Sequence, residues 1–245
     1  MKAMIFAAGL GTRLKPITDT LPKALVPVGG RTLLEHVITK LAEQGFDEQI
    51  INVHHHADKI IAFLQEKKNF GLRIEVSDER EMLLDTGGGI RKAAHFFNDG
   101  APFLVHNVDI LSDANLKALY ETHIGYGSDV TLLVKERETT RYLYFGEEDN
   151  RLKGWANIKT GERKSPNSDF KPECNNRYAF SGIQVISPKI FSLMDYYAPK
   201  FPIMDFYIEN AKEMDIRCLV DNHFRMIDVG KLDSLKEAEE HFSEL

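Results

Sequence analysis

Two glycines, an arginine and a lysine lie close together near the beginning of the chain. Gly9 and Gly11 end an apolar run at residues 2–8, and Arg13 and Lys23 follow shortly after them. Glycine lets backbone N–H groups approach a ligand closely, and a run of such groups forms a concave site for an anion. An arginine can bind two phosphate oxygens at once, whereas a lysine acts as a point charge. This segment is therefore typical of a loop that binds a polyphosphate.

Two other kinds of phosphate-binding loop do not fit this segment. A dinucleotide-binding fingerprint would need a third glycine or an alanine where Leu14 stands, and a helix would have to begin within the motif. Pro16 and Pro22 disfavour such a helix. A P-loop would need Gly-Lys followed by Ser or Thr, which the segment lacks. A surface turn between a strand and a helix is the alternative interpretation of a Gly-x-Gly pair.

Two aspartates form a second group of side chains that could do chemistry. Asp109 follows the apolar run at 103–106, and Asp228 follows the apolar residues Met226 and Ile227 of the strand expected at 225–229. In open α/β sheets, ligands bind outside the carboxyl ends of the strands. Two carboxylates that meet there could hold a Mg²⁺ whose other ligands are water and phosphate oxygens. Aspartate is also common in turns after strands, so a structural role is the alternative.

A third candidate is the glycine run at residues 87–89, which lies at the start of a segment with helical spacing. Backbone amides at the beginning of a helix can bind a phosphate or a base without obstruction by side chains. Asp85 would either cap this helix or contact the nucleotide. A flexible turn before a helix is the alternative interpretation.

Alternating strands and helices would position these candidates. Segments typical of strands lie at residues 2–8, 49–53, 73–76, 103–106 and 130–134. Helical spacing between the runs predicts an α/β fold of three layers, built on a mostly parallel, doubly wound sheet. Residues 136–178 are polar with short alternating pieces, so we expect antiparallel hairpins there. They would form a small lid insertion within a single domain over 1–245.

Composition and charge narrow the class of protein. The chain has 245 residues and a formal net charge of −6, with 31 Lys+Arg against 37 Asp+Glu. This acidic balance argues against a nucleic-acid partner, which needs a basic face. Two cysteines rule out a disulfide framework and favour a cytoplasmic location. No apolar stretch is long enough for a transmembrane helix, so we expect no membrane partner.

Taken together, these segments resemble the signature of the sugar-1-phosphate nucleotidyltransferases, also called nucleoside-diphosphate-sugar pyrophosphorylases. The resemblance extends over nearly the whole chain, with motifs at residues 9–28, 84–90, 107–109, 180–183 and 227–230. Chain length and the Thr-Gly-Gly-Gly element are most similar to the short N-acetylmuramate-1-phosphate uridylyltransferases, which make a cell wall precursor. The sequence departs from the family at Val108, because the family usually has a glycine before this aspartate.

The resemblance implies a role for each candidate residue. As catalytic residues, Arg13 would bind the departing β,γ-phosphates and Lys23 would stabilise charge at the α-phosphate. The nucleotide-binding residues would be Ala8, Gly9, Gly11, Thr12, Arg13, Lys23, Asp85, Gly87 and Gly88. The sugar would contact Asn107, Gly182 and Asp205, and Mg²⁺ would be held by Asp109 and Asp228.

The implied reaction joins a nucleoside triphosphate to a sugar-1-phosphate and releases pyrophosphate. UTP with N-acetylmuramate-1-phosphate is the favoured pair, and a mannose- or heptose-1-phosphate guanylyltransferase is the alternative. A non-catalytic nucleotide-sugar sensor is an alternative of another class. A phosphocholine transferase is a further one, for which Trp155 with Tyr142 or Tyr144 would form an aromatic cage. The sequence leaves the base, the sugar and the oligomeric state open.

Overall fold

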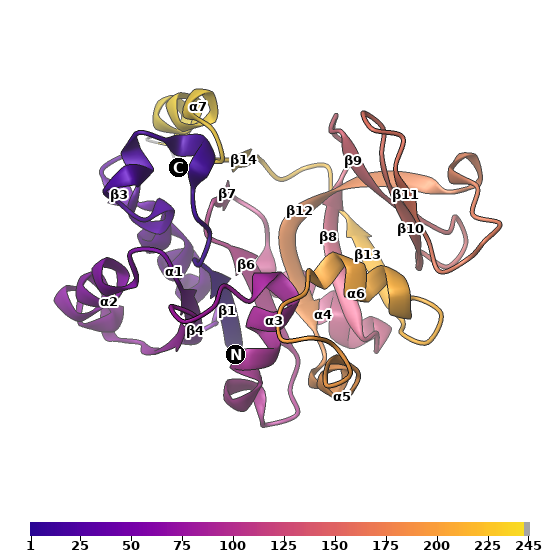
Figure 1. Ribbon diagram of the computed structural model, residues 1–245, viewed down its shortest axis with the longest axis horizontal. Helices are drawn as coiled ribbons and strands as arrows, with labels where there is room; N and C mark the ends of the chain where they lie inside the picture. The colour runs from indigo at the N-terminus through magenta and orange to yellow at the C-terminus, as the bar shows by residue number, and fades with distance from the viewer. Residues whose placement is uncertain (243–245) are drawn as a thin grey trace. The chain divides into compact units, whose positions relative to one another are not determined.

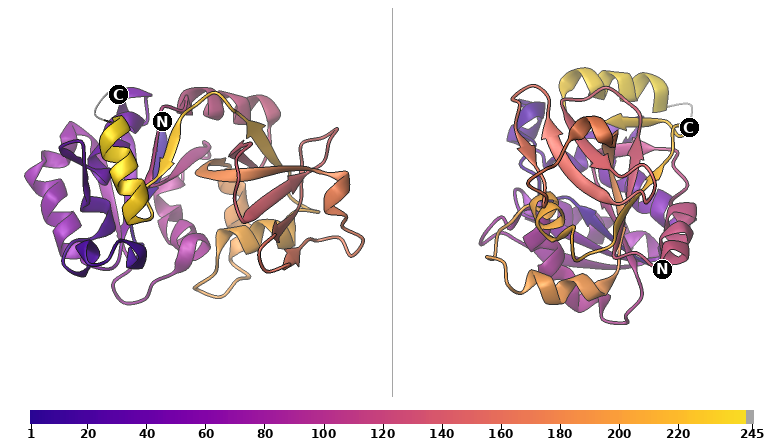
Figure 2. Two further views of the ribbon diagram at one scale, coloured as in Figure 1. Left: turned by 90° about the horizontal axis from the view of Figure 1, so that it is seen from above. Right: turned by 90° about the vertical axis from the view of Figure 1, so that its right-hand side faces the viewer.

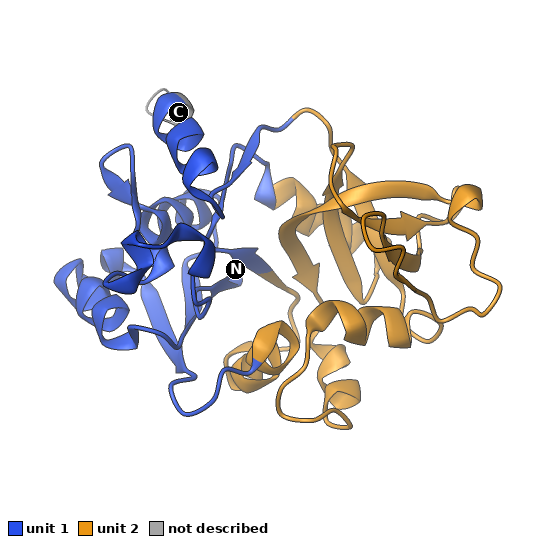
Figure 3. Cartoon of the chain, turned by 45° about the horizontal axis from the view of Figure 1, so that its top comes forward, with its two compact units in different colours: residues 1–84, 105–116, 224–245 blue, residues 85–104, 117–223 orange. Residues whose placement is uncertain are grey.

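The computed structural model describes residues 1–242 and confirms the α/β class (Figure 1). Contacts within the chain group it into two compact units (Figure 3). Unit 1 comprises residues 1–84, 105–116 and the described residues from 224 onward, and unit 2 comprises 85–104 and 117–223. Each unit is therefore assembled from separate stretches of chain. The single-domain organisation expected from the sequence stays a prediction.

Parallel strands form the centre of unit 1. Strand β1 (Lys2–Phe6) pairs in parallel with β4 (Glu48–Val53), which in turn pairs in parallel with β5 (Arg73–Asp78). Strand β6 (Phe103–Asn107) follows on the other side of β1 in the strand order. The middle residues of β1 are fully buried, as expected for a strand covered on both faces.

Two helices connect the parallel strands of unit 1. Helix α1 (Leu33–Glu43) begins at a capping-box sequence, Thr32 to Glu35, where the Glu35 N–H group donates a hydrogen bond to Oγ1 of Thr32 at 3.1 Å. Its buried residues, Leu33, Leu34, His36, Val37, Ile38 and Leu41, recur at the three- and four-residue spacing of one helix face. Helix α2 (Ala57–Glu66) follows β4 and buries Ile60 and Leu64.

Short strand pairs complete unit 1. Strand β14 (Met226–Asp228) pairs antiparallel with β7 (Ile110–Ser112), and β2 (Pro27–Val28) pairs antiparallel with β3 (Arg31–Thr32). Helix α7 (Leu232–Phe242) follows β14 and lies against β2 and β14 (Figure 2). The last part of the chain is thus built into the same unit as its beginning.

A long strand organises unit 2. Strand β12 (Asn176–Ile186) pairs antiparallel with β8 (Val130–Lys135), and β8 also pairs in parallel with β13 (Ile216–Val220). The register between β12 and β8 shifts between Phe180 and Gln184. This irregularity is a bulge in the middle of the strand.

Antiparallel strands occupy the region at 136–178, as expected from its alternating pattern. Strand β9 (Arg141–Phe145) pairs with β10 (Leu152–Asn157), and β10 pairs with β11 (Arg163–Lys164). Strand β9 also pairs with the beginning of β12. The hairpins are therefore continuous with the sheet of unit 2.

The remaining helices are α3 (Asp85–Lys92), α4 (Leu116–Tyr126), α5 (Phe191–Met194) and α6 (Ile203–Asn210). Helices α3 and α6 pack against each other within unit 2. Among residues 1–242, no helix has the length and apolar character needed to cross a membrane.

Candidate functional site

Lys23 and Asp109, which come from separate sequence motifs, are in direct contact within unit 1. The Nζ atom of Lys23 donates a hydrogen bond to Oδ2 of Asp109. Their side chains are only 10% and 20% exposed, so solvent screens the two charges less than at an open surface. A 3₁₀ turn, Lys23–Leu25, fixes the backbone of the lysine. The site therefore holds a cation directly beside a carboxylate.

The backbone brings Asp228 next to the segment that carries Asp109. Asp228 stands opposite Ile110 in the register of β14 and β7. The N–H group of Val229 donates a hydrogen bond to the carbonyl oxygen of Asp109 at 2.8 Å. The two aspartates were predicted to meet at strand ends, and this pairing places their backbones side by side.

Val108 stands where the resembled family has a glycine. Its side chain is buried, and its N–H group donates a hydrogen bond to the carbonyl oxygen of Phe6 at 3.1 Å. Val108 does not have a positive φ, so the backbone there does not require glycine. The valine adds buried apolar area beside Asp109 without forcing a strained conformation.

Arg13 and Asp228 both lie against the backbone of Gly230. A Cβ atom added at Gly230 would lie 2.7 Å from Nη2 of Arg13 and 2.7 Å from Oδ1 of Asp228. Any side chain at this position would displace one or both groups, because real Cβ contacts are longer. All four residues predicted to act on phosphates or metal, Arg13, Lys23, Asp109 and Asp228, therefore belong to unit 1.

The glycine loop after β1 has one position that requires glycine and one that is open. Gly11 has a φ of +64°, and an added Cβ would lie 2.9 Å from Cγ2 of Thr18. The hydroxyl of Thr18 donates a hydrogen bond to the carbonyl oxygen of Gly11 at 2.8 Å. Gly9, in contrast, has no atom within 4 Å of an added Cβ. The open space beside Gly9 is compatible with the close approach of a ligand to the backbone.

Asn52 and Glu79 are two buried polar residues that the sequence analysis did not single out. The Oδ1 atom of Asn52 accepts hydrogen bonds from the N–H groups of Ala7 at 2.7 Å and Ala8 at 3.3 Å. Its Nδ2 atom donates to Oε1 of Glu79 at 2.8 Å. The second oxygen of Glu79, Oε2, accepts the N–H group of Leu84 at 3.1 Å. Their exposed fractions are 3% and 1%.

This chain of hydrogen bonds connects the end of β1 to the segment before α3. The signal for it in the sequence is weak, because Asn52 is one polar residue in an apolar strand and Glu79 lies in a polar loop. A buried carboxylate that accepts two hydrogen bonds is nevertheless costly to leave unpaired. Ala8, predicted to bind the nucleotide, uses its N–H group in this network.

The glycines of α3 are engaged within unit 2. The N–H groups of Gly87 and Gly88 donate hydrogen bonds to the carbonyl oxygen of Phe201 at 2.9 and 3.3 Å. An added Cβ at Gly87 would lie 2.3 Å from Cε2 of the Phe201 ring. Asp85 has a φ of +62°, and its Oδ1 atom accepts the N–H group of Thr86 at 2.7 Å. Packing against Phe201 thus accounts for the glycine at position 87.

The predicted sugar-binding residues are divided between the two units. Asn107 ends β6 in unit 1. Gly182 has a φ of +75° and lies in the bulge of β12 in unit 2. Asp205 stands in the first turn of α6, and its Oδ1 atom accepts a hydrogen bond from Nζ of Lys164 at 2.8 Å. Gly182 and Asp205 therefore share unit 2, while Asn107 does not.

The prediction of an aromatic cage for phosphocholine is wrong. Tyr142 and Tyr144 are buried in a cluster with Ala156 and Phe170. The register pairs Trp155 with Leu143 instead, and successive strand residues point to opposite faces. Trp155 therefore lies on the other face of the hairpin from both tyrosines.

Comparison with known proteins decides the family. A family model for nucleotidyl transferases matches residues 2–244. The chain belongs to the nucleotidyl transferase family. It is 33% identical over 193 residues to the N-acetylmuramate alpha-1-phosphate uridylyltransferase of Neisseria meningitidis serogroup B, which covers 78% of this chain and 77% of that protein.

Two further relatives of this nucleotidyl transferase match over shorter segments. The N-acetylmuramate alpha-1-phosphate uridylyltransferase of Caulobacter vibrioides is 44% identical over 129 residues, 52% of this chain and 50% of that protein. The mannose-1-phosphate guanyltransferase of Aspergillus fumigatus is 38% identical over 145 residues, 58% of this chain and 40% of that protein. These matches therefore span half or less of the two relatives.

Solved structures share the fold of this nucleotidyl transferase at low sequence identity. UDP-glucose pyrophosphorylase complexed with UDP-glucose superposes with a TM-score of 0.78 at 20% identity, covering 100% of this chain and 99% of that one. HddC from Yersinia pseudotuberculosis complexed with GMP-PN gives a TM-score of 0.76 at 23% identity, covering 98% and 99%. At these identities the likeness concerns the fold.

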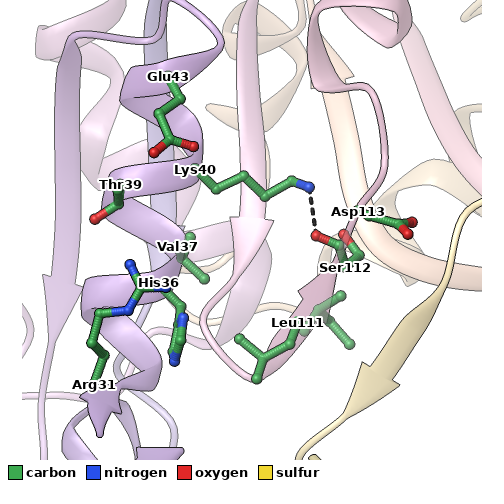
Figure 4. A pocket seen from close by; sticks show the side chains of 10 residues that line it. Arg31, His36, Val37, Thr39, Lys40, Glu43, Leu111, Ser112 and Asp113 are labelled. Atoms are coloured by element: carbon green, nitrogen blue, oxygen red, sulfur yellow. Dashed lines mark hydrogen bonds between the residues drawn. The ribbon is translucent and has the colours of Figure 1, made fainter. Parts of the chain in front are cut away.

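A separate pocket of about 220 Å³ lies in unit 1 of the nucleotidyl transferase, between α1 and β7 (Figure 4). None of the predicted site residues lines it. Lys40 crosses it, and its Nζ atom donates a hydrogen bond to the carbonyl oxygen of Ser112 at 2.5 Å. Burial lowers the pKa of Lys40, and the nearby Asp113 carboxylate opposes this shift. The pocket is thus distinct from the cluster around Lys23 and Asp109.

Proposed function

We propose that this chain makes a nucleotide-sugar and pyrophosphate from a nucleoside triphosphate and a sugar-1-phosphate. One observation carries the proposal: unit 1 holds the Lys23 ammonium against the Asp109 carboxylate, directly beside the strand that bears Asp228. This arrangement suits a phosphate-rich substrate and a divalent cation in the same place. UTP and N-acetylmuramate-1-phosphate are the favoured substrates, which would make the product a cell wall precursor.

The reaction needs no nucleophilic side chain, because an oxygen of the sugar phosphate is already anionic. That oxygen attacks the α-phosphorus of the triphosphate, and the bond from the α-phosphorus to the oxygen that bridges to the β-phosphate breaks. Catalysis then depends on positioning and on charge neutralisation. Arg13, whose guanidinium lies beside Gly230, would neutralise the departing pyrophosphate. Lys23 would stabilise the charge at the α-phosphate.

The donor set around β7 and β14 fits a magnesium ion. Asp109 and Asp228 offer hard carboxylate oxygens, and their segments are joined by backbone pairing. The carboxylate of Asp109 already accepts a cation, the Lys23 ammonium. Within residues 1–242 no group of three or more His, Cys, Asp or Glu side chains could enclose a metal by itself. Such a two-carboxylate site suits Mg²⁺, which takes its other ligands from water and phosphates.

When bound, this Mg²⁺ would neutralise charge on the phosphate groups. Lys23 would then keep its ammonium close to the same phosphates, since its hydrogen bond to Asp109 orients the lysine side chain towards them. The open backbone at Gly9 would allow the triphosphate to approach the loop after β1.

The choice of substrates rests on the relatives. Two N-acetylmuramate alpha-1-phosphate uridylyltransferases are 44% and 33% identical to the chain. A mannose-1-phosphate guanyltransferase is 38% identical over a shorter part of its own length, which supports GTP with a mannose or heptose phosphate as the second candidate.

A pyrophosphate-release assay tests the proposal. The purified chain is incubated with each of four nucleoside triphosphates and a panel of sugar-1-phosphates that includes N-acetylmuramate, mannose, heptose and glucose. We expect the highest kcat/KM for UTP with N-acetylmuramate-1-phosphate. A higher kcat/KM for GTP with mannose- or heptose-1-phosphate would overturn the favoured substrates. No release with any pair, together with retained binding of a nucleotide-sugar, would point to the non-catalytic sensor.

A further inference from the structure

Unit 2 contains a pocket of about 350 Å³ that the mechanism above does not use. One of its walls is made by the hairpin strands and the other by α6. Its lining includes Arg137, Arg141, Leu143, Trp155, Lys164 and Asp205. Asp205, predicted from the sequence to face the sugar, is one of these residues.

Strand register explains why these side chains share one face. Leu143 of β9 stands opposite Trp155 of β10, and Trp155 stands opposite Lys164 of β11. Arg141 lies two residues before Leu143 and therefore points to the same side of β9. The Lys164 ammonium lies over the Trp155 ring, 5.5 Å from its centroid. The pocket wall is thus an aromatic surface with cationic side chains at its edge.

The charges of this pocket are not balanced. The Lys164 ammonium is paired with Asp205 at 2.8 Å and with Glu162 at 3.7 Å. Arg137 donates a hydrogen bond only to a neutral acceptor, the carbonyl oxygen of Phe180, at 3.2 Å. Among residues 1–242, no carboxylate forms an ion pair with Arg137 or Arg141.

The geometry points to a site for a carboxylate carried by the sugar, formed by Arg137 and Arg141 beside Trp155. The assignment rests on the proposed function and specifies its substrate class as an acidic sugar phosphate. A guanidinium binds a carboxylate through two parallel hydrogen bonds. The apolar face of a sugar ring packs on an aromatic ring, and Trp155 with Leu143 supplies such a surface.

This chemistry separates two closely related sugars. N-acetylmuramate differs from N-acetylglucosamine only by a lactyl ether, which carries a carboxylate. Neutral sugar phosphates such as mannose-1-phosphate have no group for a second anion site. Two arginines without carboxylate partners therefore favour the acidic sugar. With a neutral sugar both guanidinium groups, which are at exposed positions, would keep water as their partner.

A binding experiment without the phosphate group isolates this site. Trp155 is the only tryptophan of the chain, so its fluorescence reports on the pocket. Free N-acetylmuramate and free N-acetylglucosamine are titrated into the full chain and into Arg137→Gln and Arg141→Gln. We expect saturable quenching by the acidic sugar alone, with Kd about tenfold or more higher in each variant, the loss typical of one charged hydrogen bond. Arg163→Gln is the matched control, because Arg163 is exposed on β11 and does not line the pocket.

Activity measurements separate the inference from the proposed function. The kcat/KM for N-acetylmuramate-1-phosphate, divided by that for N-acetylglucosamine-1-phosphate, should fall at least tenfold in Arg141→Gln. Equal losses for both sugars would mean that the arginines bind the phosphate, and this would overturn the carboxylate site while leaving nucleotidyl transfer intact. Equal quenching of the wild-type chain by the two free sugars would overturn it as well. A wild-type chain that uses neither sugar phosphate, yet binds free N-acetylmuramate through Trp155, would instead contradict the proposed function.

Discussion

The side-chain amide of Asn52 connects Glu79 to the loop that follows β1. Its Nδ2 atom lies 2.8 Å from Oε1 of Glu79, while its Oδ1 atom accepts the N–H groups of Ala7 and Ala8. Because Glu79 also accepts the N–H group of Leu84, one buried network fixes both the beginning of the glycine loop and the segment before α3. We interpret Asn52 and Glu79 as positioning residues, since neither side chain is exposed to a ligand.

Glu79→Gln should disturb this network with little change in shape. An amide has one acceptor oxygen where the carboxylate has two. The donor of either Asn52 or Leu84 would therefore face the NH₂ group of the new glutamine and lose its hydrogen bond. We expect the free energy of unfolding to fall by about 1–3 kcal/mol. We also expect kcat to fall by a factor at least as large as the factor by which KM changes. Urea unfolding and pyrophosphate release measure the two effects. Glu75→Gln, on β5 at a position whose side chain is 40% exposed, should change neither, and wild-type behaviour of Glu79→Gln would exclude the positioning role.

Arg13→Ala and Lys23→Ala should keep the fold and lose most turnover. The removal of a charge that stabilises a phosphoryl-type transition state costs about 10²–10³ in kcat. Circular dichroism checks the fold, and pyrophosphate release gives kcat. Lys117→Ala is the control, because Lys117 is 63% exposed on α4. Near wild-type turnover in either variant would remove the role assigned to that residue.

Nucleotidyl transfer should depend on a divalent cation. Excess EDTA should abolish pyrophosphate release, and added Mg²⁺ should restore it. Asp228→Asn should raise the Mg²⁺ concentration needed for half-maximal activity, because an amide is a weaker ligand for a hard cation than a carboxylate. Asp221→Asn, outside the β7–β14 pair, should leave it unchanged. Activity that persists in EDTA would contradict the magnesium site.

The stability of unit 2 should fall in mildly acidic solution through His123. Burial, and to a smaller extent the nearby Lys189 charge, lowers the pKa of His123 to about 4. Both ring nitrogens of His123 form hydrogen bonds with hydroxyl groups. Nδ1 lies 3.0 Å from Oγ1 of Thr131, and Nε2 lies 3.0 Å from Oγ of Ser187. The unfolded state, with a pKa near 6.5, binds the proton first, so stability is full above pH 6.5 and falls as the pH decreases towards 4.

The shift corresponds to a loss of about 3 kcal/mol at most. His123→Gln should therefore flatten the fall in unfolding free energy between pH 7 and pH 5, measured by urea titration. His223→Gln, at an exposed position, should retain the wild-type slope. If the unfolding free energy of His123→Gln fell with decreasing pH as steeply as that of the wild type, other groups would be responsible for the acid sensitivity.

Local patterns in the sequence predicted the elements that carry the site. Three features follow from residues that are close together in the sequence, and the structure has each of them. They are the capping box before Leu33, the buried run of β1 and the alternation in the hairpins. The pattern also placed Asp109 and Asp228 at strand ends. Their backbone pairing agrees with this prediction, while their role in metal binding stays a prediction.

Contacts between distant residues could not be predicted in the same way. Lys23 forms its hydrogen bond with Asp109, which is 86 positions away in the sequence. The N–H groups of Gly87 and Gly88 donate to the carbonyl oxygen of Phe201, which is also distant in the sequence. A polar residue such as Asn52 inside an apolar strand gives no local sign of what it binds. The beginning of β12 gives no local sign of its partner either, since Asn176 and Arg177 are polar and pair with β9 through their backbones.

The pairing of β14 with β7 has a consequence for synthesis of the protein. Asp228 belongs to a strand made after every residue of unit 2. A ribosome that has translated Asp109 must therefore complete the intervening residues before the second carboxylate emerges. The growing polypeptide would hold one half of the proposed magnesium site throughout this interval, so the proposed catalytic centre would stay incomplete until the strand that bears Asp228 has been made.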